Sequence, residues 1–186
     1  MNNNVEMLNP RERREIGLAF APEERQGHAA VGNLNLLENS LITDPKKRFQ
    51  KKMGFINFSE LNEFTNEIIE KFNVKTTGTS ALASSLSGGN LQKFVVGREI
   101  GQKPSLFIVN QPTWGVDALS AANIRQAIVE IANTGAAIIL ISQDLDEILE
   151  ISNKVAFLAN GNLSKPTNTA EIKTDKIGAI MGGISA

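Results

Sequence analysis

The sequence predicts an α/β fold in which parallel strands alternate with helices. Two continuous apolar runs, 105–110 and 136–142, are typical of strands that are buried on both faces of a sheet. Between them, Ile124, Ile128 and Ile131 recur at helical spacing. Because strand, helix and strand follow one another in this order, we expect a parallel sheet with helical connections.

The N-terminal part, 1–32, is expected to add a short helix and a core strand. Asn9 can cap a helix that starts at Pro10, and Glu12 completes the pattern of a capping box. The run GLAFA at 17–21 then predicts a buried strand, which leads into the polar loop PEERQG.

The middle part, 33–101, is mainly helical by pattern and is expected to form a helical subdomain inserted into the α/β core. Apolar residues at helical spacing predict a short helix within 33–42, a longer one over 59–73 and a third that ends near Ile100. The mixed charges of 44–57 show no period, so this stretch is predicted to be a loop.

The rest of the core is predicted over 102–186. After the strand at 136–142 we expect a short helix over 144–151 and a third buried strand of the parallel type over 154–159. The Asn-Gly pair that follows predicts a hairpin turn. A last helix is expected over 169–181.

Composition excludes several classes of function. With 19 Lys and Arg against 20 Asp and Glu, the net charge of −1 gives no general attraction to nucleic acid. The chain has no cysteine and one histidine, which excludes disulfides, thiol chemistry and a multi-histidine metal site. No apolar run approaches the roughly 18–20 residues that cross a bilayer. We expect a cytoplasmic protein.

The run Ser87-Gly88-Gly89-Asn90 precedes an apolar helical pattern. Backbone N–H groups at a helix start attract anions, and the helix dipole adds about 0.3–1 kcal/mol at an exposed site. The Ser87 hydroxyl can bond a phosphate oxygen, and glycines leave room for its approach. Taken alone, the pattern is more often a flexible lead-in to a helix.

The pattern is not alone, however. LSGGNLQK (86–93), followed by a buried strand that ends NQPTWGVD (110–117), resembles the signature and Walker B region of ABC transporter ATPase domains. PEERQG stands at the Q-loop position, GVDAL at the D-loop and ILISQDLDEIL at the switch. The Asn at 90 and the PEERQG run make the chain similar to the C-terminal ATPase domain of fused double-domain sugar and nucleoside importers.

The resemblance implies a partial P-loop NTPase (RecA-like) sheet with the ABC α-helical subdomain inserted. It also implies ATP as the cofactor, a second ABC ATPase domain and transmembrane permease subunits as partners, and no nucleic acid. The chain is then expected at the inner face of the membrane, attached through the permease. In this family the signature of one domain closes over ATP that the other domain holds. Ser87, Gly88, Gly89 and Asn90 are therefore expected to contact a partner's nucleotide.

Carried over by position, the other motifs depart from the pattern of active members. Asn110 stands where an aspartate supports magnesium, Gln111 where a glutamate is the general base, and Gln143 where the switch histidine is expected. An amide neither carries charge for Mg²⁺ nor accepts a proton from water, and general base catalysis contributes about 10²–10⁴-fold. We expect a degenerate site without metal ligands, with Mg²⁺ held mainly by the partner.

At three further motif positions, two residues are polar as the family pattern implies, and the third departs from it. Glu23 takes the Q-loop position and Asp117 the D-loop acid, and both are expected at the nucleotide. Trp114 replaces the expected arginine, a change for which the sequence offers no physical reason beyond surface packing.

The chain contains no GxxxxGK[ST] run, which in this family cradles the β- and γ-phosphates. We expect an excised piece of a longer ATPase rather than a naturally shortened one. Its sheet then has an unpaired edge and apolar surface, which favour self-association.

Three hypotheses follow from the sequence. The chain is a non-catalytic half-site that completes the partner's ATP site, a fragment of an ATPase that hydrolyses ATP once a Walker A loop is present, or an unrelated α/β module with a fortuitous Ser-Gly-Gly run. The alternative to the first hypothesis is that the signature run no longer has a function and is a relic on a decaying fragment. The transported substrate is chosen by other components and does not follow from this chain.

Overall fold

The computed structural model describes residues 5–44, 48–51 and 54–172. The chain divides into two compact units, 1–141 and 142–186, which are described one at a time. Of the last helix predicted over 169–181, the described residues hold one 3₁₀ turn, η3 (Thr169–Glu171), after which Ile172 is extended. Residues 173–181 of that prediction lie outside the described residues.

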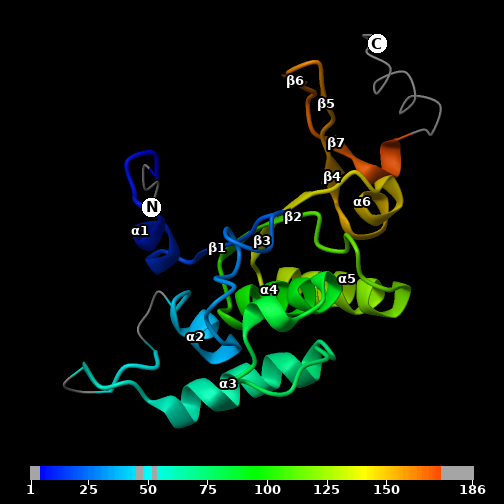
Figure 1. Cartoon of the computed structure of the whole chain (residues 1–186). Helices are drawn as coiled ribbons and strands as arrows, with labels where there is room; N and C mark the ends of the chain where they lie inside the picture. The colour runs from blue at the N-terminus through cyan, green and yellow to red at the C-terminus, as the bar shows by residue number, and fades with distance from the viewer. Residues whose placement is uncertain (1–4, 45–47, 52–53, 173–186) are drawn as a thin grey trace. The chain divides into compact units, whose positions relative to one another are not determined.

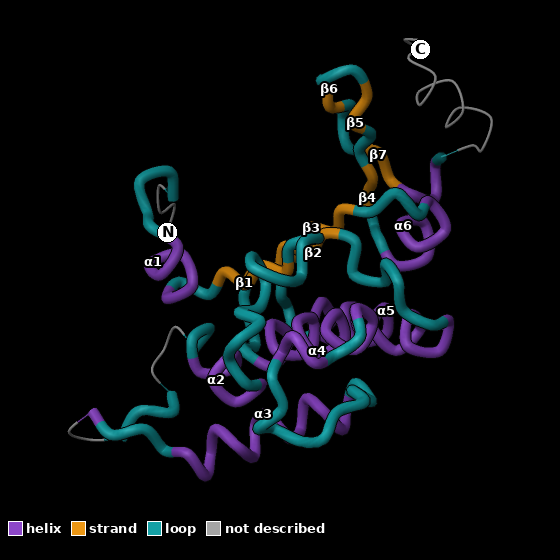
Figure 2. Tube along the Cα trace, viewed as in Figure 1, coloured by secondary structure: helices purple, strands orange, loops and turns teal. Residues whose placement is uncertain are grey.

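A three-stranded parallel sheet forms one layer of the first unit (Figures 1 and 2). Its strands are β1 (Leu18–Ala21), β2 (Leu106–Asn110) and β3 (Ala137–Ile141), and β2 lies between the other two. The register aligns Phe20 with Ile108 and Ile108 with Ile139. The predicted α/β fold with parallel strands is thereby confirmed.

Helices pack in layers on one face of this sheet. Figure 1 shows α4 (Gly88–Gly101) and α5 (Ala118–Asn133) side by side beneath the strands, with α3 (Phe58–Lys71) beyond α4. Helix α2 (Leu36–Leu41) packs on α3. None of the helices in the described part of the chain is both long and apolar enough to cross a membrane.

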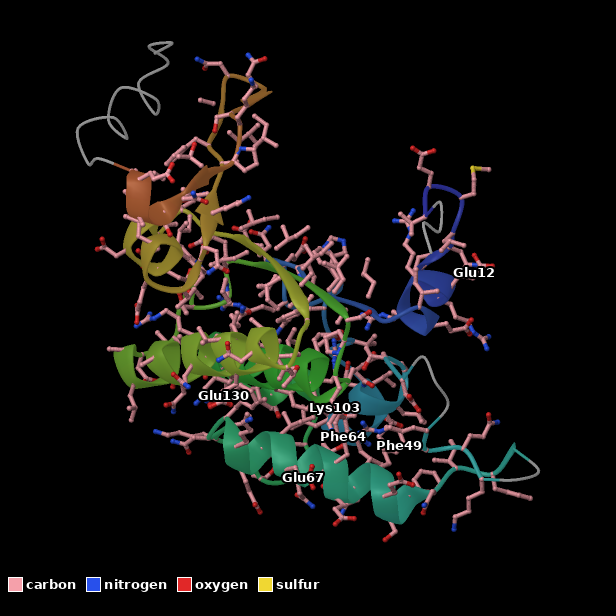
Figure 3. All side chains as sticks on the ribbon, turned by 180° about the vertical axis from the view of Figure 1, so that it is seen from behind. Glu12, Phe49, Phe64, Glu67, Lys103 and Glu130 are labelled. Atoms are coloured by element: carbon pink, nitrogen blue, oxygen red, sulfur yellow. The ribbon has the colours of Figure 1, made fainter. Side chains whose placement is uncertain are left out.

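The short helices form where their caps satisfy the first backbone N–H groups. At α1 (Pro10–Glu15), the Asn9 side chain accepts from the Glu12 N–H at 3.0 Å, and the Glu12 carboxylate accepts from the Asn9 N–H at 2.8 Å. This is the predicted capping box, and Figure 3 shows Glu12 on its helix. Asn35 and Glu38 repeat it at α2, a second box that the sequence interpretation missed.

The predicted loop of 44–57 is confirmed where it is described, but it is anchored by an aromatic side chain. Phe49 is completely buried and lies beside Phe64 of α3, with ring centroids 5.4 Å apart and planes tilted by 42° (Figure 3). The Arg48 guanidinium lies 3.9 Å from the centroid of the Phe64 ring. The loop therefore follows the surface of α3, because an aromatic pair and a cation–π contact hold it there.

A buried ionic network joins α4 to α1, α2 and the loop after β1. Glu99 accepts from Arg14 at 2.7 Å and from Arg98 at 2.8 Å. Arg98 is itself 1 % exposed, and its guanidinium also donates to the backbone carbonyls of Ala29 and Asn39. Burial lowers the pKa of Arg98 from its ordinary value, whereas the neighbouring Glu99 carboxylate raises it.

The two faces of the sheet differ in burial. Ala19, Ala21, Phe107 and Val109 alternate along β1 and β2 and are buried beneath the helices. The residues between them form what we call the open face: Leu18, Phe20, Leu106, Ile108, Asn110, Ala137, Ile139 and Ile141. On it, Phe20, Ile139 and Ile141 are 42 %, 49 % and 48 % exposed. Strands of a parallel sheet are ordinarily covered on both sides, so this apolar face favours association.

The second unit corrects one prediction. The run 154–159 does not form a third parallel strand but breaks into β4 (Lys154–Val155) and β5 (Leu158–Ala159). Both pair antiparallel with strands further along the chain, β4 with β7 (Thr167–Asn168) and β5 with β6 (Asn162–Leu163).

The reason lies in the turn that follows β5. Asn160 and Gly161 adopt positive φ angles of 50° and 77°, as the predicted hairpin turn requires, and they bring β6 back alongside β5. The Phe157 N–H, between β4 and β5, bonds the Ser164 hydroxyl at 2.9 Å. A short apolar run does not distinguish a parallel strand from a hairpin arm, and here the local turn decides. The expected helix of this region is α6 (Leu145–Ile151), capped by Asp144.

We expect Glu99→Gln to lower the free energy of unfolding by about 3 kcal/mol, because Arg98 then keeps a buried charge without a counter-charge. Urea unfolding at fixed protein concentration measures this change. Glu15→Gln is the matched control, since Glu15 pairs with Arg11 at an exposed position, where such pairs contribute at most about 1 kcal/mol. Equal losses in the two variants would show that the buried network is not what joins the elements.

The open face is expected to make the chain self-associate in dilute solution. Phe20→Lys places a charge on this face and should raise the dissociation constant of the assembly at least tenfold. Phe55→Lys makes the same change at a loop residue that is 67 % exposed, away from the sheet, and should leave it unaltered. Multi-angle light scattering over a dilution series checks both, and a monomer at every concentration of the unaltered chain contradicts the expectation.

Candidate functional site

The signature edge, Ser87–Asn90, lies at the N-terminus of α4. Ser87 is the N-cap, with φ −62° and ψ 155°, and its exposed hydroxyl accepts from the Asn90 side chain at 2.9 Å. The first N–H groups of a helix have no intrahelical acceptor, so those of Gly88 and Gly89 are available to an anion. A hydroxyl and free amides therefore meet at one exposed helix end, as the sequence predicts.

Asn90 fixes this edge to the loop that follows α3. Its side-chain oxygen accepts from the Lys75 N–H at 2.9 Å, while its amide nitrogen holds Ser87. One helical turn further on, the Lys93 ammonium donates to the Asn73 carbonyl at 2.6 Å. Burial lowers the pKa of Lys93, and the Asp117 carboxylate opposes this shift. Two hydrogen bonds therefore hold the edge to the loop after α3 before any ligand binds.

Gly89 is needed for packing within the chain. A Cβ at this position would lie 2.8 Å from the carbonyl oxygen of Gly115, which is backbone and cannot move aside. The glycine thus lets the start of α4 approach the β2–α5 turn, residues 111–117. At Gly88 the nearest atom is instead Nη1 of Arg25, at 2.9 Å, the end of a flexible side chain. The sequence interpretation gave both glycines to the ligand, and the structure adds this steric reason for Gly89.

Two of the three positions predicted as degenerate lie where β2 ends. Asn110 is the last residue of β2 and pairs with Ile141 of β3. Gln111 has φ 51°, in the left-handed region that non-glycine residues rarely adopt, and is 7 % exposed. Its N–H donates to the Ile141 carbonyl at 2.8 Å, which holds the strained backbone in place. Neither amide side chain supplies a negative charge at this strand end.

Asp117 acts as a helix cap in this structure. Its carboxylate accepts from the Ser120 N–H at 3.0 Å and from the Ser120 hydroxyl at 2.7 Å at the start of α5. The bond from the Ser120 side chain lowers the pKa of Asp117 from its ordinary value, as does the bond from the Ser120 backbone. Asp117 therefore shapes the β2–α5 turn.

Two residues near the signature edge were missed by the sequence interpretation. Gln92 is fully buried and its side-chain amide donates to the start of the β2–α5 turn, while Arg25 reaches from the loop after β1 to Gln92. Only the presence of polar residues within an apolar helical pattern could have indicated Gln92. Glu23, predicted at the nucleotide, is an exposed residue of the same loop whose charge acts on Arg25.

Comparison with known proteins places this geometry in a family. No protein-family model matches the chain. It is 34 % identical over 177 residues to a glucose import ATP-binding protein of Haloferax volcanii, covering 94 % of this chain and 32 % of the relative. It is 32 % identical over 182 residues to the nucleoside import ATP-binding protein NupA of Lactococcus lactis, covering 98 % of this chain and 36 % of the relative. The chain is a homologue of the ATP-binding proteins of ABC importers.

Solved structures agree on the fold. The post-hydrolysis dimer of the ATP-binding cassette MJ0796, bound to ADP and phosphate, matches with a TM-score of 0.72 at 18 % identity, covering 88 % of this chain and 68 % of that one. An inward-facing metal-chelate type ABC transporter matches with a TM-score of 0.66, covering 90 % and 64 %. The ABC ATPase fold is thus confirmed. The chain spans about a third of the length of the curated relatives it matches.

The predicted ABC motif residues fall into two groups. Ser87–Asn90, Gln111 and Asp117 belong to the first unit, where α4 packs against the β2–α5 turn. Gln143 belongs to the second unit and is exposed two residues after β3. Among the described residues, no group of three His, Cys, Asp or Glu side chains could hold a metal ion.

Asp117→Asn should make the stability of this ABC domain less dependent on pH. The folded-state pKa of Asp117 is lowered, so its ionised form stabilises the fold above the unfolded-state pKa, and this contribution is lost as the pH falls through the folded-state pKa. The free energy of unfolding of the unaltered chain should therefore exceed that of Asp117→Asn most at pH 7 and least near pH 2–3. Urea unfolding at a series of pH values measures the difference, and a gap that widens toward acid pH contradicts the assignment.

Proposed function

We propose that this chain is a non-catalytic ATP-binding component of an ABC importer, which lends its signature edge to ATP held by a second ATPase domain. In this arrangement Ser87 and the amides of Gly88 and Gly89 bond the γ-phosphate from the side opposite the partner's phosphate-binding loop. Asn90 keeps the serine hydroxyl in position. The site formed around this chain's own β2 remains degenerate.

One observation carries the proposal: the signature edge is intact and exposed, whereas the acids at the end of β2 are absent. Ser87 and Gly88 are exposed at the start of a helix whose interior is buried. Asn110 and Gln111 meanwhile replace both carboxylates that the family uses at this strand end. Because the two features serve different nucleotides, losing one does not remove the use of the other.

The division of chemistry follows from charge. The partner domain holds ATP and Mg²⁺ and supplies the general base, because Asn110 and Gln111 offer no carboxylate. Ser87 and the α4 amides offer hydrogen-bond donors, which stabilise negative charge on the transferred phosphoryl group without proton transfer. Asp117 on the β2–α5 turn and Glu23 on the loop after β1 are proposed to lie at the nucleotide.

Transport and location are inferred from the relatives. Homologues import sugars and nucleosides, so a carbohydrate or a nucleoside is the proposed cargo. Hydrolysis at the composite site would drive transmembrane permease subunits, which hold the chain at the cytoplasmic face of the membrane. A second candidate, supported by the same homology, is that the chain is part of an ATPase that hydrolyses ATP itself when a Walker A loop is supplied.

Ser87→Arg tests the proposal. The chain is mixed with the Walker A-containing ATPase domain of the same transporter, and MgATP hydrolysis is followed by phosphate release. The unaltered chain should stimulate hydrolysis, and Ser87→Arg should reduce the stimulation about 100-fold or more, since a bulky cation replaces the hydroxyl that bonds the phosphate.

The matched control is Ser59→Arg, an exposed serine in the first turn of α3. It should stimulate as the unaltered chain does. Stimulation that survives Ser87→Arg rules the proposal out. Hydrolysis at ordinary family rates by a single domain that joins this chain to a Walker A loop favours the second candidate instead.

A further inference from the structure

Gln92 is a fully buried amide at the junction of α4 with the β2–α5 turn. Its nitrogen donates to the carbonyls of Gln111 at 3.2 Å and Pro112 at 3.0 Å. Its oxygen accepts from Nε of Arg25 at 2.9 Å. Both donor hydrogens and the acceptor oxygen are therefore used, and the orientation of the amide is fixed by three partners.

Arg25 bonds the same turn from the other side. While its Nε donates to Gln92, its Nη2 donates to the Trp114 carbonyl. Its Nη1 lies against the signature edge, 2.9 Å from where a Cβ would stand at Gly88. One planar guanidinium, carried by the loop after β1, thus contacts both the start of α4 and the β2–α5 turn, and a lysine cannot reproduce this fork.

This placement is electrostatically unfavourable for a cation. The N-terminus of α4 carries partial positive charge, and partial burial lowers the pKa of Arg25. Glu23 opposes that shift from two residues away. Two acceptors and one nearby carboxylate therefore hold a cation where the helix dipole repels it.

We propose that Arg25 and Gln92 are positioning residues that set the signature edge at a fixed distance from the β2–α5 turn. This inference rests on the proposed function: the edge can meet a partner's phosphate only if α4 and the turn present it rigidly. The turn carries Gln111, whose backbone is strained. The bond from Gln92 to the Gln111 carbonyl therefore also helps to keep this residue in its strained conformation.

A tryptophan next to this network can serve as a fluorescent probe of its rigidity. Trp114 is the one tryptophan in the sequence and is 62 % exposed, while its carbonyl is the acceptor for Arg25. Time-resolved fluorescence anisotropy of Trp114 therefore follows the motion of the turn in the isolated chain. Stimulation of MgATP hydrolysis in the partner ATPase domain follows the presentation of the signature edge.

Arg25→Lys and Gln92→Glu are the test variants, and Arg11→Lys is the matched control on exposed α1. Arg25→Lys retains the charge but loses the fork, whereas Gln92→Glu retains the acceptor for Arg25 but turns an oxygen toward two carbonyls. In both, the residual anisotropy of Trp114 should fall and the kcat of stimulated hydrolysis should fall at least fivefold, with the KM for MgATP changed less than twofold. Arg11→Lys should change neither readout.

The outcomes separate the two proposals. If the unaltered chain gives no stimulation, the proposed function fails, and the anisotropy series still shows whether the network holds the turn. If stimulation occurs but either variant leaves the anisotropy or the kcat unchanged, the positioning role is overturned. A loss in Arg11→Lys equal to that in Arg25→Lys overturns it as well.

Discussion

Burial of α4 on all sides is the constraint from which the rest of the first unit follows. Every residue from Leu91 to Glu99 is buried, so the helix contacts the sheet, α3 and α5 at once. Gly97 permits the closest approach, because a Cβ there would lie 2.5 Å from the Phe72 ring. A helix held in this way cannot rotate or slide without disturbing three neighbours. Its packing therefore also fixes the position of the residues at its ends.

The exposed N-terminal end is where this rigidity becomes useful. Ser87 and Gly88 are exposed, whereas Gly89 packs against the Gly115 carbonyl and Gln92 is bonded to the start of the β2–α5 turn. Hydrogen-bond donors stabilise a developing charge best when they are already in place before the charge appears. Under the proposed function, the interior of α4 determines how well its end can bond a phosphate, whether or not Asn110 and Gln111 support chemistry of their own.

The sequence predicted the parallel sheet, its helices and the signature edge because these depend on local signals. Continuous apolar runs, helical spacing and the Asn9 capping box each act within a few residues. The third parallel strand was wrong because the apolar run at 154–159 has the same pattern in a hairpin arm, and the turn at 160–161 outweighed it. Burial of Phe49 within a charged loop was likewise invisible, since it depends on a partner ring on α3.

The sequence indicated the motif residues of the candidate site, but not the contacts that hold these residues in place. Ser87, Gly88, Gly89 and Asn90 were found through their pattern, whereas Arg25 and Gln92 make contacts across 67 residues of chain that no spacing rule reaches. Asp117 was expected as a nucleotide contact and is seen as a cap on α5. Contacts between segments distant in sequence therefore account for most of what the sequence left open.

The most direct measurement is a crystal structure of this chain bound to the Walker A-containing ATPase domain and a slowly hydrolysed MgATP analogue. We expect the nucleotide and metal in the partner's loop, with the Ser87 hydroxyl and the Gly89 N–H within hydrogen-bond distance of the γ-phosphate. Nucleotide bound by this chain alone, with the metal beside Asn110 and the signature edge empty, would contradict the central claim.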